Sequence, residues 1–294
     1  MKEIYVYDLN IPELTVYQER KEAGLLHCQE PAPGLFIAES PNVIRRALAA
    51  GYEPVSFLAE ERLADNTRKL LAECCQSCAD FSSLPFYIAK GDLLENITGY
   101  PMTRGVLGAF RRKFLPDPSA LLSRCRRVAV LENVMNPTNL GAIFRSAAAL
   151  NMDAVLLTRG CTDPLYRRAI RVSMGTVFQI PWTFFGTPSP SDTVHPCAPA
   201  DPSPTTFPGW MSLLRMHGFR TAAMALTDDC VSVRDPRIHQ EKKLAVILGT
   251  EGPGLLPETI ASSDYTIKIP MSHDVDSLNV AAASAIAFWE LGQN

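Results

Sequence analysis

Residues 132–149 read ENVMNPTNLGAIFRSAAA, an Asn- and Pro-rich turn that leads into a helical run of small and apolar residues. We expect Asn139 to occupy the cap position of this helix, which would continue to about Asn151. Arg145 lies roughly 1.7 turns further along, in an otherwise apolar stretch. It should project toward whatever binds near the start of the helix, the alternative being an exposed arginine with no special role.

Short apolar runs surround this segment. RRVAVLEN precedes it, and DAVLLT, VFQIPW, FRTAAMAL, KLAVILG and YTIKIP follow, rich in Val and Ile and separated by helix-length segments. This pattern predicts an α/β domain over residues 121–294 with a largely parallel sheet, whose ligands gather at the carboxyl ends of its strands. GLFIAE, PVSFLAEE and LPFYIA alternate with helical patterns earlier in the chain and predict a smaller α/β domain over residues 1–115. FRRKFLPDPSALLSR, with its charges and two prolines, is the expected linker.

Composition agrees with a folded two-domain protein. The chain has 294 residues, of which 47% are hydrophobic and 20% charged, which excludes a disordered chain. It contains no uninterrupted apolar run of about 18 residues, and MKEIYVYDLN lacks the apolar core of a signal peptide, so we expect a cytoplasmic protein. Residues 186–209 are dense in Pro, Ser and Thr and predict a flexible surface insertion.

The eight cysteines do not have the spacing of a disulfide scaffold. Cys75 and Cys78 form a CxxC pair, but a structural zinc site needs four ligands, and no second CxxC or paired histidine motif follows. We therefore expect no metal and mostly buried, apolar cysteines.

The net charge of −3 gives no global sign of nucleic-acid binding, but basic residues gather in two places. Seven of them face a single acid between residues 104 and 127, and a second cluster lies between residues 159 and 171. A solvated surface is the simplest interpretation of one such run, whereas two runs on either side of one motif favour a track for RNA phosphates. The candidate RNA-binding residues are Arg104, Arg111, Arg112, Lys113, Arg167, Arg168 and Arg171.

Two further segments follow predicted strands. In LGTEGPGL, residues 248–255, three glycines let backbone amides approach a ligand, although the Gly-Lys-Ser/Thr ending of a P-loop is missing. In IKIPMSHDVDSLNVAAASAIAFWE, residues 267–290, Ser277 and Asn279 introduce an alanine-rich helix.

The three segments together resemble the SpoU branch, or TrmH family, of the SPOUT RNA methyltransferases. ENVMNPTNLGAIFRSA resembles the first motif, LGTEGPGL the second and IPMSHDVDSLNVA the third, and the likeness covers most of residues 126–294. RRAIRVSMGTVFQIPW is also similar to this family, with Ser173 and Gly175 in the usual places. The first domain is similar, less specifically, to an L30e-like RNA-binding domain.

The resemblance implies a SPOUT-type parallel sheet with a C-terminal trefoil knot, a homodimer, and S-adenosylmethionine bound within the knot. It implies methyl transfer to a ribose 2′-hydroxyl of rRNA or tRNA. The residues that it places at the cofactor are Leu226, Thr227, Gly249, Glu251, Gly252, Ile269, Met271 and Leu278. Those that it places around the transferred methyl and the target ribose are Asn139, Arg145, Glu251, Ser277 and Asn279.

The chemistry of the guanidinium group decides between two roles for Arg145, a fixed positive charge and a general base. A guanidinium stays protonated in proteins, so we assign Arg145 a fixed positive charge that grips phosphate and stabilises the developing oxyanion, rather than the role of a base. The acceptor of the hydroxyl proton stays open between water and Ser277. The family usually has glycine where this chain has His273, and histidine tolerates a positive φ better than a β-branched residue does.

Two other functions remain as alternatives. One is an RNA-binding protein of the same fold that no longer transfers methyl groups, which the presence of all five catalytic candidates disfavours. The other is a methyltransferase that acts on a base, which the Asn139 and Arg145 motif disfavours because it marks the ribose branch.

Overall fold

The structure, a computed structural model, describes residues 1–8, 11–18, 22–28, 32–74, 82–98, 105–186, 208–273 and 275–292. It divides into two compact units. The first unit comprises Met1–Phe114 and Leu165–Gln179, and the second comprises Leu115–Pro164 and Ile180–Asn294. Arg104, Cys75, Cys78 and nearly all of the expected insertion at 186–209 lie outside the described residues.

The first unit is built on a mixed sheet in the order β1-β4-β3-β5-β2. Strands β1, β4 and β3 run parallel, whereas β5 runs antiparallel to β3 and β2. The strands are β1 (Lys2–Val6), β2 (Leu35–Glu39), β3 (Pro54–Glu60), β4 (Pro85–Ala89) and β5 (Val106–Arg111). The helices are α1 (Thr15–Gln18), α2 (Glu22–His27), α3 (Pro41–Ala49), α4 (Ala64–Cys74), α5 (Gly91–Thr98) and α8 (Arg167–Val172).

The sequence pattern missed β1 and β5, and it placed the end of β5 in the linker. Gly108 in the middle of β5 lowers the strand propensity of VLGAFR. A Cβ atom at Gly108 would approach the rings of Phe110 and Phe57 to 2.7 and 2.9 Å, so the glycine makes room for these two aromatic side chains. The need for a small residue here comes from packing that is invisible in the sequence.

Residues 165–179 belong to the first unit through specific contacts. Arg46 donates to the carbonyl oxygen of Met174 at 2.7 Å, and the ring of Phe178 packs against Phe36 and Tyr52 with centroids 5.4 and 5.2 Å away. The expected strand VFQIPW is wrong: residues Thr176–Phe178 form a short 3₁₀ helix, and the strand begins only at Trp182. Gly175, with φ of 81°, precedes this helix and redirects the chain.

The second unit contains a seven-stranded sheet in the order β10-β12-β9-β11-β6-β7-β8. Every neighbouring pair is parallel, which confirms the predicted parallel sheet. The strands are β6 (Arg127–Glu132), β7 (Ala154–Leu157), β8 (Trp182–Phe184), β9 (Arg220–Met224), β10 (Val231–Ser232), β11 (Leu244–Gly249) and β12 (Tyr265–Lys268). All residues of β6 are buried, as expected for a central strand covered on both faces.

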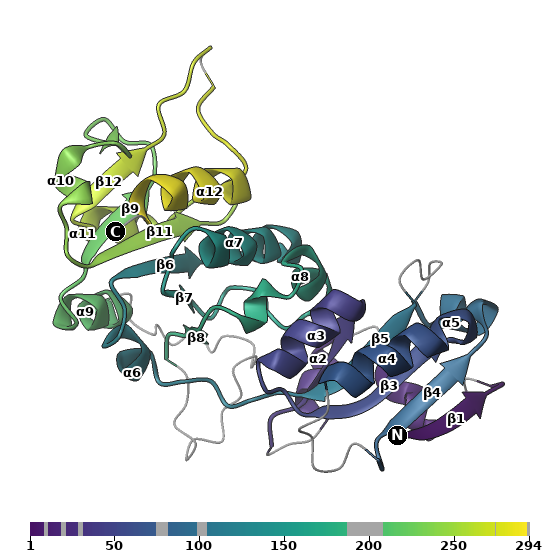
Figure 1. The fold of residues 1–294 in the computed structure, drawn as a ribbon. Helices are drawn as coiled ribbons and strands as arrows, with labels where there is room; N and C mark the ends of the chain where they lie inside the picture. The colour runs from purple at the N-terminus through teal and green to yellow at the C-terminus, as the bar shows by residue number, and fades with distance from the viewer. Residues whose placement is uncertain are drawn as a thin grey trace. The chain divides into compact units, whose positions relative to one another are not determined.

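Helices cover both faces of this sheet. Helix α7 (Pro137–Ala149) packs beside α12 (Val280–Leu291), as Figure 1 shows, and α12 also contacts β11. A hydrophobic core is formed by β6, β9 and β11 together with the helices α6 (Pro118–Leu122), α9 (Pro208–Met216) and α11 (Pro257–Ser262). Helix α10 (Pro236–His239) follows β10. Among the described residues, no helix has the length and apolar character needed to cross a membrane.

Candidate active site

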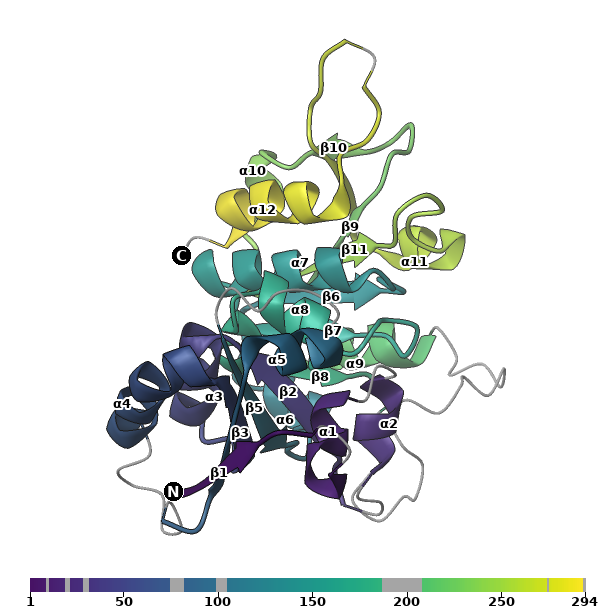
Figure 2. The ribbon, with the colours of Figure 1, turned by 90° about the vertical axis from the view of Figure 1, so that its right-hand side faces the viewer.

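The three sequence motifs meet at one edge of the second unit's sheet. Strands β12, β9, β11 and β6 are consecutive neighbours and parallel, so their carboxyl ends share this carboxyl-terminal edge. The segments that follow these strands carry the predicted site residues. Figure 2 shows the described residues between β12 and α12 projecting beyond the sheet at this edge.

Helix α7 begins three residues earlier than the sequence suggested. Its N-cap is Asn136, whose side chain accepts a hydrogen bond from the backbone N–H of Thr138 at 2.9 Å, and Pro137 is its first residue. Proline fits this position because its fixed φ is already helical and its missing N–H is not needed there. Asn139 is therefore not a cap but a residue of the first turn, and it is 6% exposed.

Asn139, Asn279 and Glu251 form a hydrogen-bonded cluster that joins the three motifs. The Asn279 amide nitrogen donates to Asn139 Oδ1 at 3.1 Å and to Glu251 Oε1 at 2.6 Å. Asn279 Oδ1 accepts the backbone N–H of Ala281 at 2.9 Å, so Asn279, one of the two residues expected to introduce α12, is its N-cap. Both ends of this amide are engaged, which fixes its orientation and positions the Glu251 carboxylate beside it.

Glu132 is a site residue that the sequence analysis missed. Its carboxylate is 2% exposed and accepts the backbone N–H of Leu256 at 2.9 Å and the hydroxyl of Thr259 at 2.6 Å. The last residue of β6 thus fixes the end of the glycine-rich segment that follows β11. The signal available in the sequence was a carboxylate at the end of an otherwise apolar, central strand, where a buried charge requires partners.

The glycines of LGTEGPGL have two different roles. A Cβ atom at Gly249 would lie 2.4 Å from the carbonyl carbon of Gly254 and 2.5 Å from the nitrogen of Leu255, so Gly249 lets the loop close on itself. The closed loop is held by an antiparallel bridge between Thr250 and Gly254. Gly252 and Gly254 have φ of 83° and 71°, and their missing Cβ atoms would point into open space. The backbone is exposed where a ligand could approach it.

A half-buried cysteine supports the turn after β6. Cys161 Sγ accepts from the backbone N–H of Val134 at 3.3 Å and donates to the carbonyl oxygen of Leu131 at 3.2 Å. Burial raises the pKa of Cys161 to about 11, so the thiol stays protonated and keeps its donor. Asn133, with φ of 56°, is held by its backbone N–H bond to Thr158 Oγ1 at 3.0 Å.

Arg145 and Ser277 do not join the hydrogen-bonded cluster. Arg145 is exposed and makes no hydrogen bond or ion pair with any residue that the structure describes. Six residues of ideal helix place it about 9 Å along α7 from Asn139 and on a different face. Ser277 is also exposed, and its hydroxyl donates to Asp276 Oδ1 at 3.2 Å.

The predicted cofactor residues lie at this edge with apolar side chains accessible. Leu226 and Thr227 follow the end of β9, and Leu226 is 53% exposed. Ile269 and Met271 are half-buried after β12, and Leu278 is exposed just before α12. His273 has φ of 61°, so this position adopts the left-handed conformation that glycine would favour.

Most of the described candidates for RNA binding have partners inside the first unit. Arg111 pairs with Glu53 at 3.1 Å, and Arg112 donates to the carbonyl oxygen of Leu35. The remaining contacts are Lys113 with the carbonyl oxygen of Ala50 and the ring of Tyr52, Arg167 with the carbonyl oxygen of Tyr17, and Arg171 with Glu39. Arg168 is exposed on α8. Their contribution to RNA binding stays a prediction.

No group of three or more His, Cys, Asp or Glu side chains within the described ranges could hold a metal ion. The cluster instead offers an amide, a carboxylate and exposed backbone, which suit an organic ligand. Arg145, exposed further along α7, is a cation that could meet the anionic part of such a ligand.

Comparison with known proteins connects this site to a family. Residues 126–200 and 203–289 match the SpoU rRNA Methylase family. An uncharacterized tRNA/rRNA methyltransferase of Mycobacterium bovis is 37% identical over 257 residues, which cover 87% of this chain and 80% of the relative. The 23S rRNA (guanosine-2'-O-)-methyltransferase RlmB of Acinetobacter baylyi is 27% identical, over 69% of this chain and 75% of the relative.

A solved structure shares the fold. The AdoMet-bound rRNA methyltransferase of Sinorhizobium meliloti matches with a TM-score of 0.73 and 20% identity, covering 98% of this chain and 97% of that one. The family match includes all three motifs and spans more than half of the chain. The chain is therefore a member of the SpoU rRNA methylase family.

Proposed function

We propose that the protein transfers a methyl group from S-adenosylmethionine to a ribose 2′-hydroxyl of rRNA or tRNA. The observation that carries this proposal is the Asn139, Asn279 and Glu251 cluster, which lies at the carboxyl-terminal edge next to an open, glycine-rich loop. Family membership supports it, as does the likeness to a relative named as a guanosine 2′-O-methyltransferase.

The carboxyl-terminal edge fits S-adenosylmethionine. Leu226, Ile269 and Leu278 offer apolar surface for a neutral adenine ring, and the exposed backbone at Gly252 and Gly254 offers polar groups without side chains in the way. Thr227, Gly249, Glu251 and Met271 complete the proposed binding residues. The cofactor supplies an electrophilic methyl group there.

The chain's own residues position the hydroxyl and stabilise charge. The Asn279 amide, held by Asn139 and Glu251, orients the ribose, and alignment of the oxygen with the methyl removes an entropic cost before the reaction. Arg145 lies about 9 Å along α7 from Asn139, so we assign it to the phosphate next to the target ribose, and from there its positive charge favours the oxyanion that forms as the proton leaves. The hydrogen bond from Ser277 to Asp276 supports a relay for that proton, with direct loss to water as the other route.

Three further features are proposed because the family resemblance implies them. We propose a trefoil knot in the C-terminal part of the second unit, an L30e-like role in RNA binding for the first unit, and a homodimer. Ile286 and Trp289 support the dimer, because they lie three residues apart on α12 and Trp289 is 62% exposed. Exposed apolar side chains that adjoin on one helix are typical of a protein interface.

The experiment that tests this function is a map of ribose methylation across rRNA and tRNA in cells with and without the gene. We expect one or a few 2′-O-methylated nucleotides to disappear in the deletion and to return with the wild-type gene. Complementation with an Arg145→Ala gene is the matched control and should not restore them. An unchanged map would favour the alternative, an RNA-binding protein of this fold that lacks methyl transfer.

A further inference from the structure

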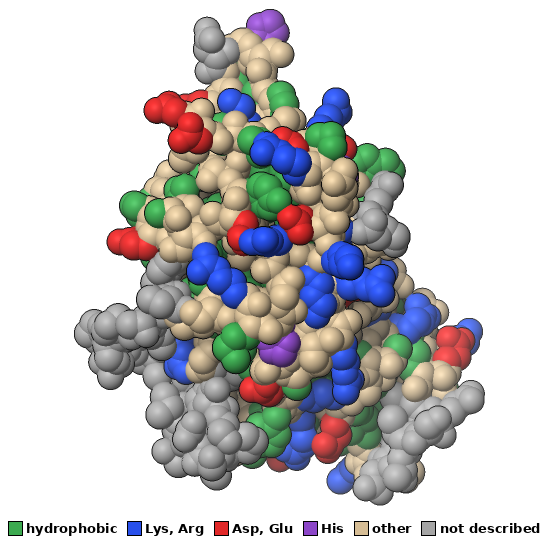
Figure 3. Space-filling view, turned by 90° about the vertical axis from the view of Figure 1, so that its left-hand side faces the viewer, with side chains coloured by type: hydrophobic (Ala, Val, Ile, Leu, Met, Phe, Trp, Pro, Cys, Tyr) green, Lys and Arg blue, Asp and Glu red, His purple; other side chains and the backbone are tan. Residues whose placement is uncertain are grey.

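The opposite edge of the second unit's sheet, where the strands begin, is basic. Arg220 is the first residue of β9, and Arg126 and Lys243 directly precede β6 and β11. The register pairs Leu244 of β11 with Arg127 of β6 and with Arg220 of β9. The backbones that carry Arg126, Lys243 and Arg220 therefore lie on three neighbouring strands, each about 5 Å from the next. Arg124, Arg215 and Lys242 extend the row, and Figure 3 shows Lys and Arg side chains gathered on this face.

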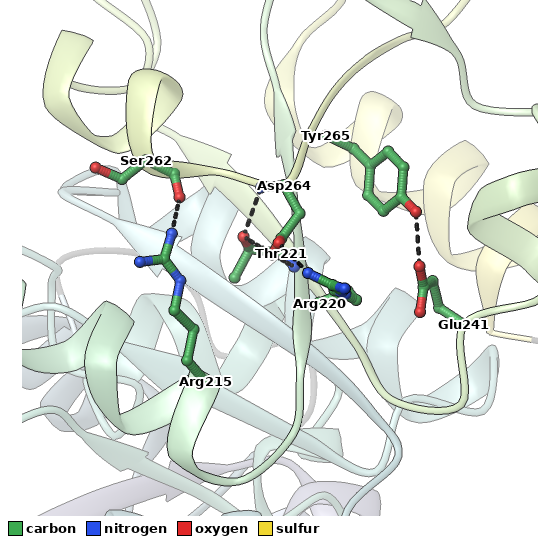
Figure 4. Close-up of polar contacts among 7 residues, drawn as sticks. All are labelled: Arg215, Arg220, Thr221, Glu241, Ser262, Asp264 and Tyr265. Atoms are coloured by element: carbon green, nitrogen blue, oxygen red, sulfur yellow. Dashed lines mark hydrogen bonds and ion pairs between the residues drawn. The ribbon is translucent and has the colours of Figure 1, made fainter.

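The carboxylates at this amino-terminal edge are engaged by neighbouring groups. Asp264 accepts from Arg220 at 2.7 Å and from the backbone and hydroxyl of Thr221, and Glu241 accepts from the hydroxyl of Tyr265 at 2.6 Å (Figure 4). Burial raises the pKa of Asp264, but the hydrogen bonds from Thr221 and Arg220 outweigh it and hold the pKa below its ordinary value. Asp153 accepts the backbone N–H groups of Arg126 and Arg127.

These arrangements leave several cations available for an external anion. Within the described part of the chain, the side chains of Arg124, Arg126 and Lys242 form no hydrogen bond or ion pair, and all three are exposed. The other three cations of the row have partners: Arg220 pairs with Asp264, Arg215 donates to the carbonyl oxygen of Ser262, and Lys243 lies over the ring of Phe219. The edge therefore has a net positive charge that the protein itself does not neutralise.

A buried arginine fixes the backbone that carries these cations. Arg127 is 4% exposed, and its guanidinium donates to the carbonyl oxygens of Glu241 at 2.9 Å, Lys242 at 3.3 Å and Leu291 at 3.0 Å. The segment with Lys242 is thus held against the start of β6, beside Arg126. Because this backbone is already ordered, binding of a ligand by its side chains has a lower cost in backbone conformational entropy.

The carboxyl-terminal edge has the opposite character. Asp228, Asp229, Glu251 and Asp276 are all exposed there. These four carboxylates outnumber Lys268, the exposed cation at the end of β12, and they repel the phosphates of RNA, so this edge attracts its substrate by charge less well than the amino-terminal edge does. An RNA that delivers one ribose to it needs an anchor on another surface.

We propose that the amino-terminal edge of the second unit's sheet binds phosphates of the substrate RNA, away from the ribose that is methylated. This inference rests on the proposed function, because it takes RNA as the substrate. A six-residue strand separates the two edges by about 20 Å, so the anchored phosphates lie several nucleotides from the target. The contacts are with phosphate and carry no sequence preference of their own.

The test compares RNA binding by two variants that remove equal charge. Arg126→Gln/Lys242→Gln removes two unpaired cations of this edge. Arg234→Gln/Arg237→Gln is the matched control, because these arginines are already paired, with Glu290 at 3.7 Å and Asp235 at 2.7 Å. Affinity for bulk rRNA and bulk tRNA is measured between about 50 and 200 mM salt.

We expect the first variant to bind about tenfold more weakly at low salt, with a slope of log affinity against log salt that is shallower by about 1.4 to 1.8. Its cofactor affinity and its methylation rate at saturating RNA should equal those of wild type, and the control variant should keep the wild-type slope. An unchanged slope in the first variant, or an equal change in both variants, would overturn the RNA anchor alone. A wild-type protein that binds no RNA would contradict the proposed function as well.

Discussion

Gly249→Val should lose at least about 100-fold in affinity for S-adenosylmethionine, equivalent to roughly 2.7 kcal/mol. The reason lies within the loop itself. A Cβ atom at Gly249 would be 2.4 Å from a backbone atom of Gly254, and backbone cannot move aside as a flexible side chain does. The loop from Thr250 to Leu255 must open, and the backbone that we assign to the cofactor is displaced. Calorimetric titration of the folded variant measures the loss.

Two further variants separate loop geometry from other effects. Gly209→Ala is the control, because a Cβ atom at Gly209 meets nothing within 4 Å, and it should bind the cofactor normally. Glu132→Ala removes the carboxylate that holds the end of the loop and leaves the N–H of Leu256 without its acceptor. We therefore expect about tenfold weaker binding of S-adenosylmethionine. Glu132→Gln should retain most of the affinity, because its amide can still accept from Leu256 and donate to Thr259. Wild-type affinity in Gly249→Val would place the cofactor elsewhere.

Arg145→Ala should slow single-turnover methylation by about 100- to 1,000-fold, the usual effect of removing one group that stabilises an oxyanion. Its fold and its cofactor affinity should be unchanged, because Arg145 is exposed and has no hydrogen bond or ion pair among the described residues. Arg145→Lys should recover part of the rate, since it keeps the charge but loses the planar fork that grips phosphate.

The pH dependence of these variants distinguishes a fixed charge from a base. A lysine loses its proton near pH 10, whereas a guanidinium does not. If Arg145 acts as a fixed charge, the rate of Arg145→Lys from pH 7 to 10 should not rise beyond the wild-type profile. A lysine variant that overtakes wild type at high pH would indicate a base at this position. Full activity in Arg145→Ala would remove Arg145 from the mechanism.

Much of the second unit could be predicted from local sequence. Its strands are apolar runs bounded by turns, and central parallel strands such as β6 and β11 are buried on both faces, so their pattern is unambiguous. The expected strand VFQIPW failed for a different reason. Gly175 and the packing of Phe178 against two rings favour a 3₁₀ turn there, and aromatic contacts between distant segments leave no local pattern.

In the site, too, residues whose contacts are local in the sequence were easier to predict than residues whose partners are distant. Asn279 was predictable as a cap because the signal lies within its own helix terminus. Asn139 was misplaced by three residues because two asparagines compete for one cap and Pro137 decides between them. Glu132 was missed because both of its partners are more than 120 residues away in the chain. The hydrogen bonds of Asn279 to Asn139 and Glu251 likewise depend on how the sheet brings distant loops together.

The most direct test of the central claim is the position of the methyl group in the product. The purified protein is incubated with S-adenosylmethionine and with rRNA or tRNA from cells that lack the gene, and the RNA is digested to nucleosides for mass spectrometry. Our account predicts a 2′-O-methylated nucleoside in the wild-type reaction and, in the same short incubation, at least about 100-fold less of it with Arg145→Ala. A methyl group on a base, or no methylated nucleoside with either RNA, would contradict it.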